Sequence, residues 1–432
     1  MARTCWKYFE KNTQKSGLAN AVNNYPSTTL WDTASYLAAI VSVREFGIIT
    51  PQEADDRIGR LLDVLARLDL FRDELPNKVY HAATLEKVGY TNKPGEIGFS
   101  AIDLGRILTW LRIVKERHPR FADAADRVVL RWRFDNVVDR RGMMFGAMVT
   151  KDGKTQYVQE GRLGYEEYAA RGFELWGFNT DLAARAEPFA TIPIYCVEVP
   201  YDSRDPRKYQ QHNYVVTESY ALDGLEFDWD ETMDRRTGGR RHSHPWMKDF
   251  ADRVYQAQEN RFAATGILTA RSEHQLDDAP YFVYDTVFTD GYAWNTITED
   301  GKHVPQFAAV ALKAALGMWV LWSSPYTDRL FEAIAGRNEP ELGFYEGILE
   351  NGKGPIKAFT ANNNGIMLET LLYKVQGKLL KWGTPREGLW ERRMQQPYGP
   401  DARTRPNAAP QPPGAAASPA APPSQPSQPA QR

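Results

Sequence analysis

The chain has 432 residues, and its 53 Lys and Arg residues nearly balance 55 Asp and Glu residues, which leaves a formal net charge of −2. Apolar residues make up 42% of the chain and charged residues 25%, an ordinary composition for a globular protein with a large core. Basic residues adjoin only in short pairs such as Arg235-Arg236, which excludes a nucleic-acid-binding surface. No apolar run approaches the length of a membrane span.

The two cysteines, Cys5 and Cys196, lie far apart in the sequence. A disulfide between them is possible, but cysteines so distant are expected to stay as free, small apolar side chains. The chain begins inside a helical pattern, without a secretory signal. A mature domain of an exported protein would have this beginning, and so would a cytoplasmic protein.

The first half of the chain alternates helical patterns with short extended ones. The helix that ends before Gly47 is capped by polar residues, and Pro51 opens the next helix at a position where its missing N–H costs nothing. Residues 78–89 are predicted to form a short β-hairpin or an extended loop, and residues 142–157 a second hairpin. Helical periodicity predicts helices over residues 2–12, 31–46, 52–68, 100–117, 122–132, 163–176 and 180–186.

In the second half, residues 190–216 have little helical character and are rich in Tyr, Pro and Asp. Ordered loops of this length are commonly functional. Residues 281–287 form the clearest strand pattern, and a loop with Asp290 and Trp294 follows it. Further helices are predicted over residues 220–227, 245–265, 306–322, 326–335 and 364–381.

Six segments share one design, in which a polar, acidic or aromatic cluster opens directly into a helical pattern rich in small residues. They begin at Leu30, Phe99, Glu160, Thr217, His303 and Thr360. More ordinary surface helices lie between them. Six inner and six outer helices in alternation predict an all-α fold, an (α/α)6 barrel with short β-hairpins and long loops at the rim where the inner helices begin.

One domain is expected over residues 1–397. From residue 398 to residue 432 the composition changes to Pro, Ala, Ser and Gln. Such a segment buries too little apolar surface to offset its ordering entropy, so a disordered tail is predicted.

Aromatic residues make up 12% of the chain, and 12 of them are tryptophans. Trp and Tyr offer flat apolar faces with a polar edge, which suits pyranose rings, although most of these residues are expected simply to fill the space between helices. Aromatic residues and carboxylates gathered at one rim predict a pocket for a sugar chain. The sequence therefore indicates a carbohydrate-active enzyme.

Glycoside hydrolysis needs two carboxyl groups that flank the scissile bond. Glu166 and Glu218 are the first candidates, because each lies in the first turn of an inner helix, where free N–H groups give a positive potential. Their aromatic neighbours, Tyr165 and Tyr220, would limit solvation and raise the pKa of the acid. A single Glu at such a position is usually a capping or dipole partner. Two of them on adjacent inner helices favour catalysis.

Asp32 and Asp103 begin two further inner helices, where they could act as the base, hold sugar hydroxyls or simply cap the helix. Glu160 lies just before the helix of Glu166, and either residue could supply the catalytic carboxyl group at this position. The predicted catalytic residues are Glu166, Glu218, Asp32 and Glu160. The predicted substrate-binding residues are Trp31, Asp103, Arg162, Tyr165, Tyr220, Asp290, Trp294 and Asn363.

Neither a metal nor a cofactor is predicted. His242 and His244 are two residues apart, and the segment around them offers no cysteine and no third histidine at a useful spacing. No glycine-rich phosphate motif is present, which disfavours a nucleotide cofactor.

Residues 29–37, 161–170 and 217–227 resemble a bacterial cell-envelope family long labelled as a domain of unknown function. That family is similar in turn to the glycoamylase-like group, which includes endo-β-1,2-glucanases and the transglycosylating domain of cyclic β-1,2-glucan synthases. The resemblance covers about residues 2–382. It implies an (α/α)6 barrel and a periplasmic or secreted protein.

In the glycoamylase-like relatives an aromatic-Glu pair opens one inner helix and a Ser-Glu-Ser pattern opens a later one. Tyr165-Glu166 and Thr217-Glu218-Ser219 match those positions best. This chain departs from the relatives after the first Glu, where residues 167–170 replace their Leu-Met-Pro. The resemblance therefore implies the fold and leaves the glycosidic linkage open.

Together, these features predict a glycoside hydrolase or transglycosylase that acts inside a β-glucan or related bacterial polysaccharide by a two-carboxylate mechanism. Carboxylates on separate helices leave space for a water molecule, which favours inversion of the anomeric configuration. The alternative is a non-catalytic polysaccharide-binding protein of the cell envelope that keeps the aromatic subsites. The expected partner is a polysaccharide or oligosaccharide. The oligomeric state is not predicted.

Overall fold

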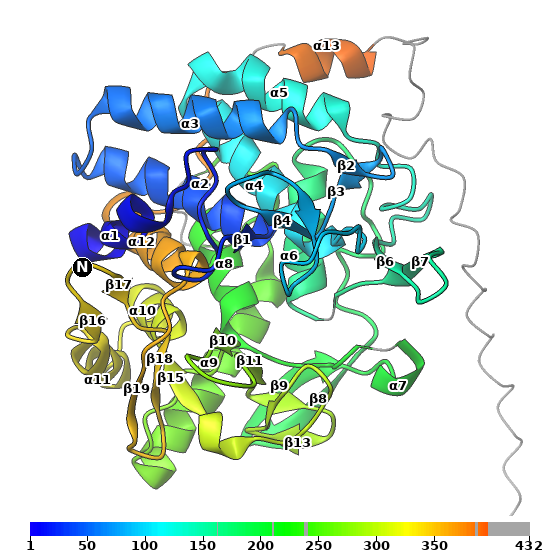
Figure 1. Ribbon diagram of the computed structural model, residues 1–432. Coiled ribbons are helices and arrows are strands. Elements are labelled where there is room, and N and C mark those ends of the chain that lie inside the picture. Colours follow the sequence, from blue (N-terminus) through cyan, green and yellow to red (C-terminus); the bar gives the residue numbers. More distant parts are fainter. Residues whose placement is uncertain (162, 210, 237–240, 385–387, 396–432) are drawn as a thin grey trace, which may run out of the picture.

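The computed structural model describes residues 1–395 except 162, 210, 237–240 and 385–387, and it is rich in helix (Figure 1). Six helices, which we call the inner helices, each contact the next one along the chain, and the last contacts the first. They are α2 (Leu30–Glu45), α4 (Ala101–Arg117), α6 (Tyr165–Glu174), α8 (Thr217–Phe227), α10 (Leu312–Leu321) and α12 (Ala361–Gln376).

Five further helices each pack against an inner helix. They are α1 (Ala2–Asn12), α3 (Pro51–Leu65), α5 (Ala122–Arg131), α9 (Pro245–Thr265) and α11 (Pro325–Ile334). The remaining helical segments are η1 (Pro119–Phe121), α7 (Pro206–Tyr209), η2 (Pro305–Phe307) and α13 (Leu389–Gln395). Among the described residues, none of these helices combines the length and the apolar character that a membrane crossing requires.

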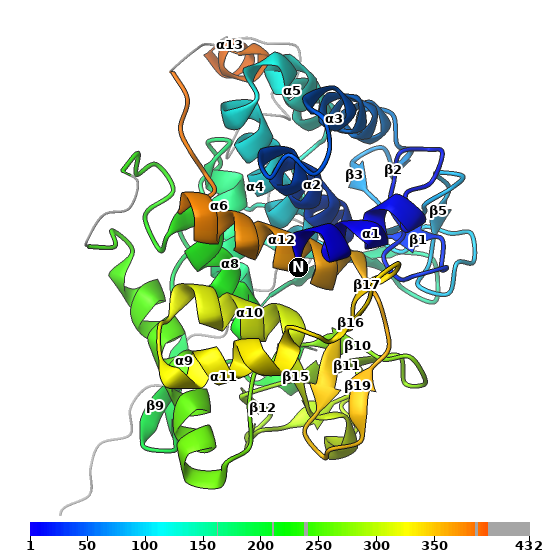
Figure 2. The same ribbon diagram turned by 90° about the vertical axis from the view of Figure 1, so that its left-hand side faces the viewer.

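Short antiparallel hairpins connect the helices, and most of them lie on one side of the inner helices (Figure 2). In the first half of the chain the strands are β1 (Ser27–Thr28), β2 (Leu70–Phe71), β3 (Leu75–Pro76), β4 (Val79–His81), β5 (Lys87–Val88), β6 (Phe145–Val149), β7 (Thr155–Gln159), β8 (Phe189–Ile194) and β9 (Val197–Asp202). The β4–β5 and β6–β7 pairs confirm the two predicted hairpins.

The strands of the second half are β10 (His274–Gln275), β11 (Phe282–Asp285), β12 (Phe288–Thr289), β13 (Tyr292–Ala293), β14 (Thr296–Ile297), β15 (Ala309–Ala311), β16 (Asn338–Glu339), β17 (Gly343–Phe344), β18 (Gly347–Leu349) and β19 (Gly354–Ile356). Strand β11 lies within the predicted strand. The protein is thus helix-rich with a modest strand content, as expected for a helical fold with short β-hairpins.

Two of the helix predictions need correction beyond a shift of a few residues at the ends. Residues 180–186 form turns instead of an outer helix, because the N–H of Ala183 donates to the distant carbonyl of Gly142 rather than to a helical neighbour. The β8–β9 hairpin lies between α6 and α8 along the chain instead. The helix predicted from residue 306 begins only at Leu312, because residues 309–311 pair with β18. The expected domain boundary after residue 397 lies outside the described residues.

Small residues allow the inner helices to approach closely. A Cβ atom at Gly105 of α4 would lie only 2.5 Å from the backbone of Ala169 in α6, and one at Gly172 would lie 1.9 Å from the Gly105 carbonyl oxygen. A Cβ at Gly365 of α12 would lie 2.6 Å from the Ser35 carbonyl oxygen in α2. Such distances leave no room for any side chain, so the packing of these pairs requires glycine.

A fully buried arginine lies among the inner helices. The guanidinium of Arg106 in α4 contacts Glu226 of α8 at 3.0 Å and Glu369 of α12 at 2.9 Å. It also donates to the hydroxyls of Tyr168 in α6, at 3.0 Å, and Ser35 in α2, at 3.2 Å. Burial, and then the neighbouring Glu369, raises the pKa of Glu226 to about 8 against the effect of Arg106. One arginine therefore holds two carboxyl groups, and burial raises the pKa of both.

Replacing Arg106 by Met should lower the free energy of unfolding by about 3–5 kcal/mol, because two buried carboxyl groups lose their cation. Without Arg106 their pKa values rise further, so the loss should be larger at pH 8 than at pH 5.5, where both groups can be protonated. Urea denaturation at the two pH values measures this. Arg127→Met on the exposed face of α5 is the control. A loss below about 1 kcal/mol at pH 8 would contradict the assignment.

Candidate active site

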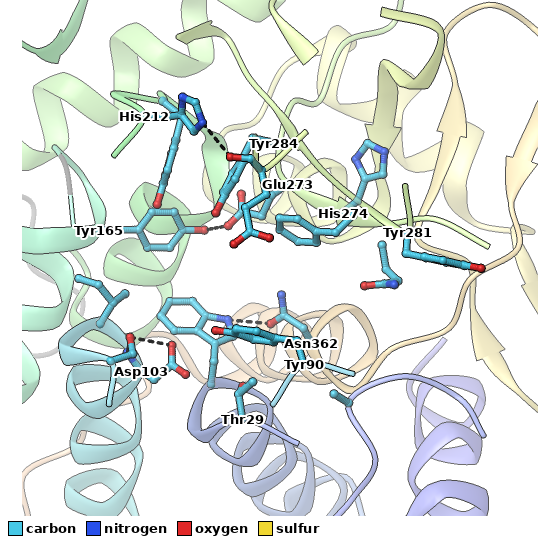
Figure 3. A pocket seen from close by; sticks show the side chains of 18 of the residues that line it. Thr29, Tyr90, Asp103, Tyr165, His212, Glu273, His274, Tyr281, Tyr284 and Asn362 are labelled. Atoms are coloured by element: carbon cyan, nitrogen blue, oxygen red, sulfur yellow. Dashed lines mark hydrogen bonds between the residues drawn. The ribbon is translucent and has the colours of Figure 1, made fainter. Parts of the chain in front are cut away.

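A cleft of about 1960 Å³ opens where the inner helices begin (Figure 3). Five inner helices each place a residue of their first turn in its lining: Trp31, Asp103, Tyr165, Lys313 and Asn362. The predicted convergence of helix N-termini at one site therefore holds for these five helices. Hairpins and loops from both halves of the chain build the walls.

Capping side chains fix where three of these helices begin. The hydroxyls of Thr29, Ser100 and Thr360 each accept a hydrogen bond from the backbone N–H three residues later, at 3.1, 3.1 and 3.0 Å. Each cap satisfies an N–H group that the first turn leaves free. Because a helix turns by about 100° per residue, the cap also decides which side chain of the first turn points into the cleft.

The sixth inner helix places Glu218 directly behind the lining. Its carboxylate is 2% exposed and accepts hydrogen bonds from Trp31 Nε1 at 3.2 Å and from Asn362 Nδ2 at 3.3 Å. It also forms an ion pair with Lys313. Side chains from α2, α12 and α10 thus converge on a carboxylate of α8, which lies just beneath the floor of the cleft.

Lys313 is 3% exposed and lies near several carboxyl groups. Burial disfavours its charge, but Glu218, Glu273 and Glu346 together raise its pKa. Glu273 lines the cleft and accepts a hydrogen bond from the hydroxyl of Tyr165. Burial, and then the charge of Glu218, raises the pKa of Glu273. A single ammonium among three carboxyl groups leaves negative charge in surplus, which favours retention of a proton.

Asp103 lies across the cleft from Tyr165 and Glu273 (Figure 3). Burial, and then the charges of Glu160 and Asp32, raises the pKa of Asp103 to about 7. Glu160 accepts a hydrogen bond from the backbone N–H of Ala101 in the first turn of α4. The cleft therefore holds carboxyl groups on both sides, and at least one of them is about half protonated at neutral pH.

Six predicted site residues line the cleft: Trp31, Asp32, Asp103, Glu160, Tyr165 and Asp290. Asp290 pairs with His212, whose Nδ1 lies 2.6 Å from a carboxylate oxygen. Glu218 lies behind the lining, as described above. Arg162 lies outside the described residues.

The other four predicted residues are not in the lining. Glu166 follows Tyr165 in α6, and the helical rotation of one residue turns its side chain away from the cleft. It is 3% exposed and pairs with Arg204 at 2.7 Å. Burial raises its pKa to about 6, and Arg204 opposes this.

Tyr220 is buried in a separate apolar cluster. Trp294 lies beneath the guanidinium of Arg261. Asn363 is fully buried, and its side chain accepts a hydrogen bond from the backbone N–H of Lys313 at 3.1 Å. Its neighbour Asn362 lines the cleft instead.

Several cleft residues were not predicted from the sequence, above all Glu273, Lys313 and Glu346. Lys313 is the second residue of α10, the same position that Trp31 and Glu218 hold in their helices. A correct start for α10 would have identified it. Glu273 and Glu346 lie outside helices and reach the cleft through long-range pairing, for which a local pattern carries no signal.

Comparison with known proteins identifies the family. A family model described as "Protein of unknown function (DUF3131)" matches residues 1–377, so the chain belongs to this family. A search among curated proteins finds no match. The resemblance to a domain of unknown function related to the glycoamylase-like group is thus confirmed.

Solved structures of glucan-degrading enzymes share the fold. An endo-β-1,2-glucanase from Chitinophaga pinensis, in complex with sophorotriose and glucose, aligns with a TM-score of 0.60 at 12% identity, over 88% of this chain and 92% of that one. An endo-β-1,2-glucanase from Talaromyces funiculosus, in complex with sophorose, aligns with a TM-score of 0.57 at 10% identity, over 88% of this chain and 83% of that one. At such identities the likeness establishes the fold alone.

Replacing Asp103 by Asn should stabilise the protein at pH 8 and have little effect at pH 4. The folded state holds the pKa of Asp103 near 7, above its ordinary value of 3.8. The contribution of Asp103 to stability is therefore fully present below about pH 4 and is lost as the pH rises through 7. Asn stays neutral at every pH, so the variant avoids the cost of a buried charge at pH 8. Thermal unfolding at the two pH values measures this, with exposed Asp123→Asn as the control. A variant less stable than the wild type at pH 8 would contradict the assignment.

Proposed function

We propose that this member of the DUF3131 family is a glycoside hydrolase that cleaves within a β-glucan or related bacterial polysaccharide, with transglycosylation as a variant of the same chemistry. In this proposal the six inner helices form the closed ring of an (α/α)6 barrel. One observation carries the proposal: Asp103 and Glu273 lie on opposite sides of a cleft that aromatic side chains also line. Two carboxyl groups that flank a sugar-binding space are what glycoside hydrolysis requires.

The roles follow from the proton affinities. Asp103, with a pKa of about 7, still holds a proton near neutral pH and donates it to the leaving oxygen. Glu273 activates a water molecule on the opposite face of the sugar. Asp32 and Glu160 act as neighbours that keep the pKa of Asp103 high, and Glu218 positions Trp31 and Lys313.

The catalytic pair proposed here is Asp103 and Glu273, whereas the sequence predicted Glu166 and Glu218. The reason is access, because a carboxyl group must reach the bound sugar and neither Glu166 nor Glu218 is in the cleft lining. The two proposed groups come from α4 and from the segment before β10, which leaves room for a water molecule and favours inversion.

The substrate and location are proposed from the relatives. Of the two glucanases that share the fold, one was solved with sophorotriose and glucose and the other with sophorose, which supports a neutral glucan as substrate. The resemblance of residues 29–37, 161–170 and 217–227 to an envelope family supports a periplasmic or secreted protein.

A second candidate is a non-catalytic polysaccharide-binding protein. One observation favours it: Glu273 accepts hydrogen bonds from Tyr165 and, at 3.0 Å, from Ser272, so its oxygens already have partners. Incubation with soluble glucans separates the two candidates. A binding protein leaves the chain length of the glucan unchanged, whereas the enzyme shortens or rearranges it.

Asp103→Asn and Glu273→Gln should each lower kcat/KM on the cleaved glucan by at least about 100-fold, because positioned acid–base groups contribute about 10²–10⁴ in rate. A panel of soluble β-glucans assayed by reducing ends identifies the substrate and measures the loss. Asp123→Asn and Glu332→Gln, both exposed and remote from the cleft, are the matched controls. Losses below about tenfold in both cleft variants, with the fold intact, would refute the assignment.

The rate should also depend on pH in a defined way. As Asp103 loses its proton, kcat/KM should fall above a pH of about 7, by about tenfold per unit. On the acid side it should fall as Glu273 gains a proton, at a pH above the ordinary glutamate value of 4.5. Initial rates across pH 4–10 measure both limbs. Activity that stays level through pH 9 would exclude Asp103 as the acid.

A further inference from the structure

A continuous row of aromatic rings leads from the floor of the cleft to its rim. The ring centroids of Trp31 and Tyr165 lie 5.5 Å apart, and those of Tyr165 and Tyr214 lie 5.9 Å apart. Tyr214 stacks on Tyr284 at 4.8 Å with an angle of 14°, and Phe282 meets Tyr284 at 5.2 Å. All five residues line the cleft, and we call them the aromatic wall.

The outer end of the aromatic wall is held by a buried charge. In β11 the side chains alternate, so Phe282 and Tyr284 face the cleft while Val283 and Asp285 are fully buried. The Asp285 carboxylate pairs with Arg271 and accepts from the backbone N–H of Ala309 at 2.9 Å. The two rings are therefore presented by a fixed strand rather than by a free loop.

The middle of the aromatic wall is aligned by backbone pairing. The residue after Tyr214, Val215, pairs with Phe288 just beyond β11, through the hydrogen bond from the Val215 N–H to the Phe288 carbonyl at 2.8 Å. This pairing brings the segment before α8 beside β11, so that Tyr214 stacks on Tyr284. Two segments about 70 residues apart in the sequence thus supply consecutive rings.

Another exposed ring faces the aromatic wall. Tyr90 lies across the cleft from Tyr281 and Tyr284 (Figure 3), and 63% of its surface is exposed. Its backbone carbonyl accepts a hydrogen bond from the hydroxyl of Tyr25 at 2.9 Å, which helps to fix the loop that carries it. Phe282 is itself 36% exposed. Large aromatic side chains left exposed on both sides of a cleft indicate a ligand that covers them.

The charge of the outer cleft restricts the ligand. Asp277, Glu299 and Asp300 are exposed and lie in the lining near β11 and β14. Burial, and then the charge of Glu299, raises the pKa of Tyr284. The Glu299 carboxylate therefore lies near the outer rings. Across the whole lining, carboxyl groups outnumber the lysines and arginines, among them the exposed Arg207 and Lys357. A polyanion would therefore be repelled, whereas sugar hydroxyls can donate hydrogen bonds to the carboxylates.

We propose that the aromatic wall is a row of glycan-binding subsites, so that the preferred ligand is an uncharged oligosaccharide or polysaccharide chain long enough to extend from Trp31 to Phe282. Tyr90 contacts the bound chain from the opposite side of the cleft. The proposal rests on the proposed function in assuming a glycan ligand, but it concerns binding and holds whether or not the chain is cleaved.

The test is the dependence of affinity on ligand length. The dissociation constants of linear β-1,2- and β-1,3-gluco-oligosaccharides, from the disaccharide upward, are measured by calorimetry in a Glu273→Gln background that prevents turnover. Affinity should rise with length. Phe282→Ala and Tyr284→Ala should weaken binding of the longest ligands about three- to tenfold and leave the disaccharide unchanged, since one aromatic contact is worth about 0.5–1.5 kcal/mol. A polyuronate of equal length should not bind.

Tyr292→Ala is the matched control, because Tyr292 is 70% exposed on the neighbouring hairpin but does not line the cleft. It should leave every affinity unchanged. Equal losses for short and long ligands, no loss in either cleft variant, or no binding by the wild type would overturn the proposal. If the wild type binds long chains in this pattern but never cleaves them, the hydrolase assignment fails and the aromatic wall stands.

Discussion

The buried guanidinium of Arg106 is the interaction on which the arrangement of the inner helices depends. It lies on α4 and joins Glu226 of α8, Glu369 of α12, and the hydroxyls of Tyr168 and Ser35 on α6 and α2. A buried charge is tolerated only when it is paired and hydrogen-bonded, so these five helices can pack only in positions that satisfy it. The close contacts at Gly105 and Gly365 are compatible with that single arrangement.

The same cation connects the core to the cleft. Arg106 lies 4.9 Å from the ring of Trp31, whose Nε1 donates to Glu218, and Glu218 in turn pairs with Lys313. Burial, and then the neighbouring carboxylates along this path, raises the pKa values of Glu226 and Glu273. A fold that keeps protons on buried carboxyl groups has the means for acid catalysis at neutral pH.

The floor and the walls of the cleft have different origins. The floor consists of first-turn residues of the inner helices, whose positions are set by packing in the core. The aromatic wall adds rings from the hairpins and from the segment before α8, anchored by Asp285. Because loops vary more easily than packed helices, the walls are the part of the cleft that can change most readily.

The sequence by itself determined the helix-rich architecture. Polar caps and small-residue periodicity located five of the six inner helices, and the rule that helix N-termini converge placed Trp31, Asp103 and Tyr165 in one cleft. Only the tertiary structure decided which first-turn residue faces the cleft. A helix turns by about 100° per residue, so neighbouring residues point in different directions. Asn362 therefore lines the cleft and the predicted Asn363 does not, and Tyr165 lines it whereas Glu166 does not. Glu273 and Glu346 reach the site through strand pairing between distant segments, and local periodicity does not encode such contacts.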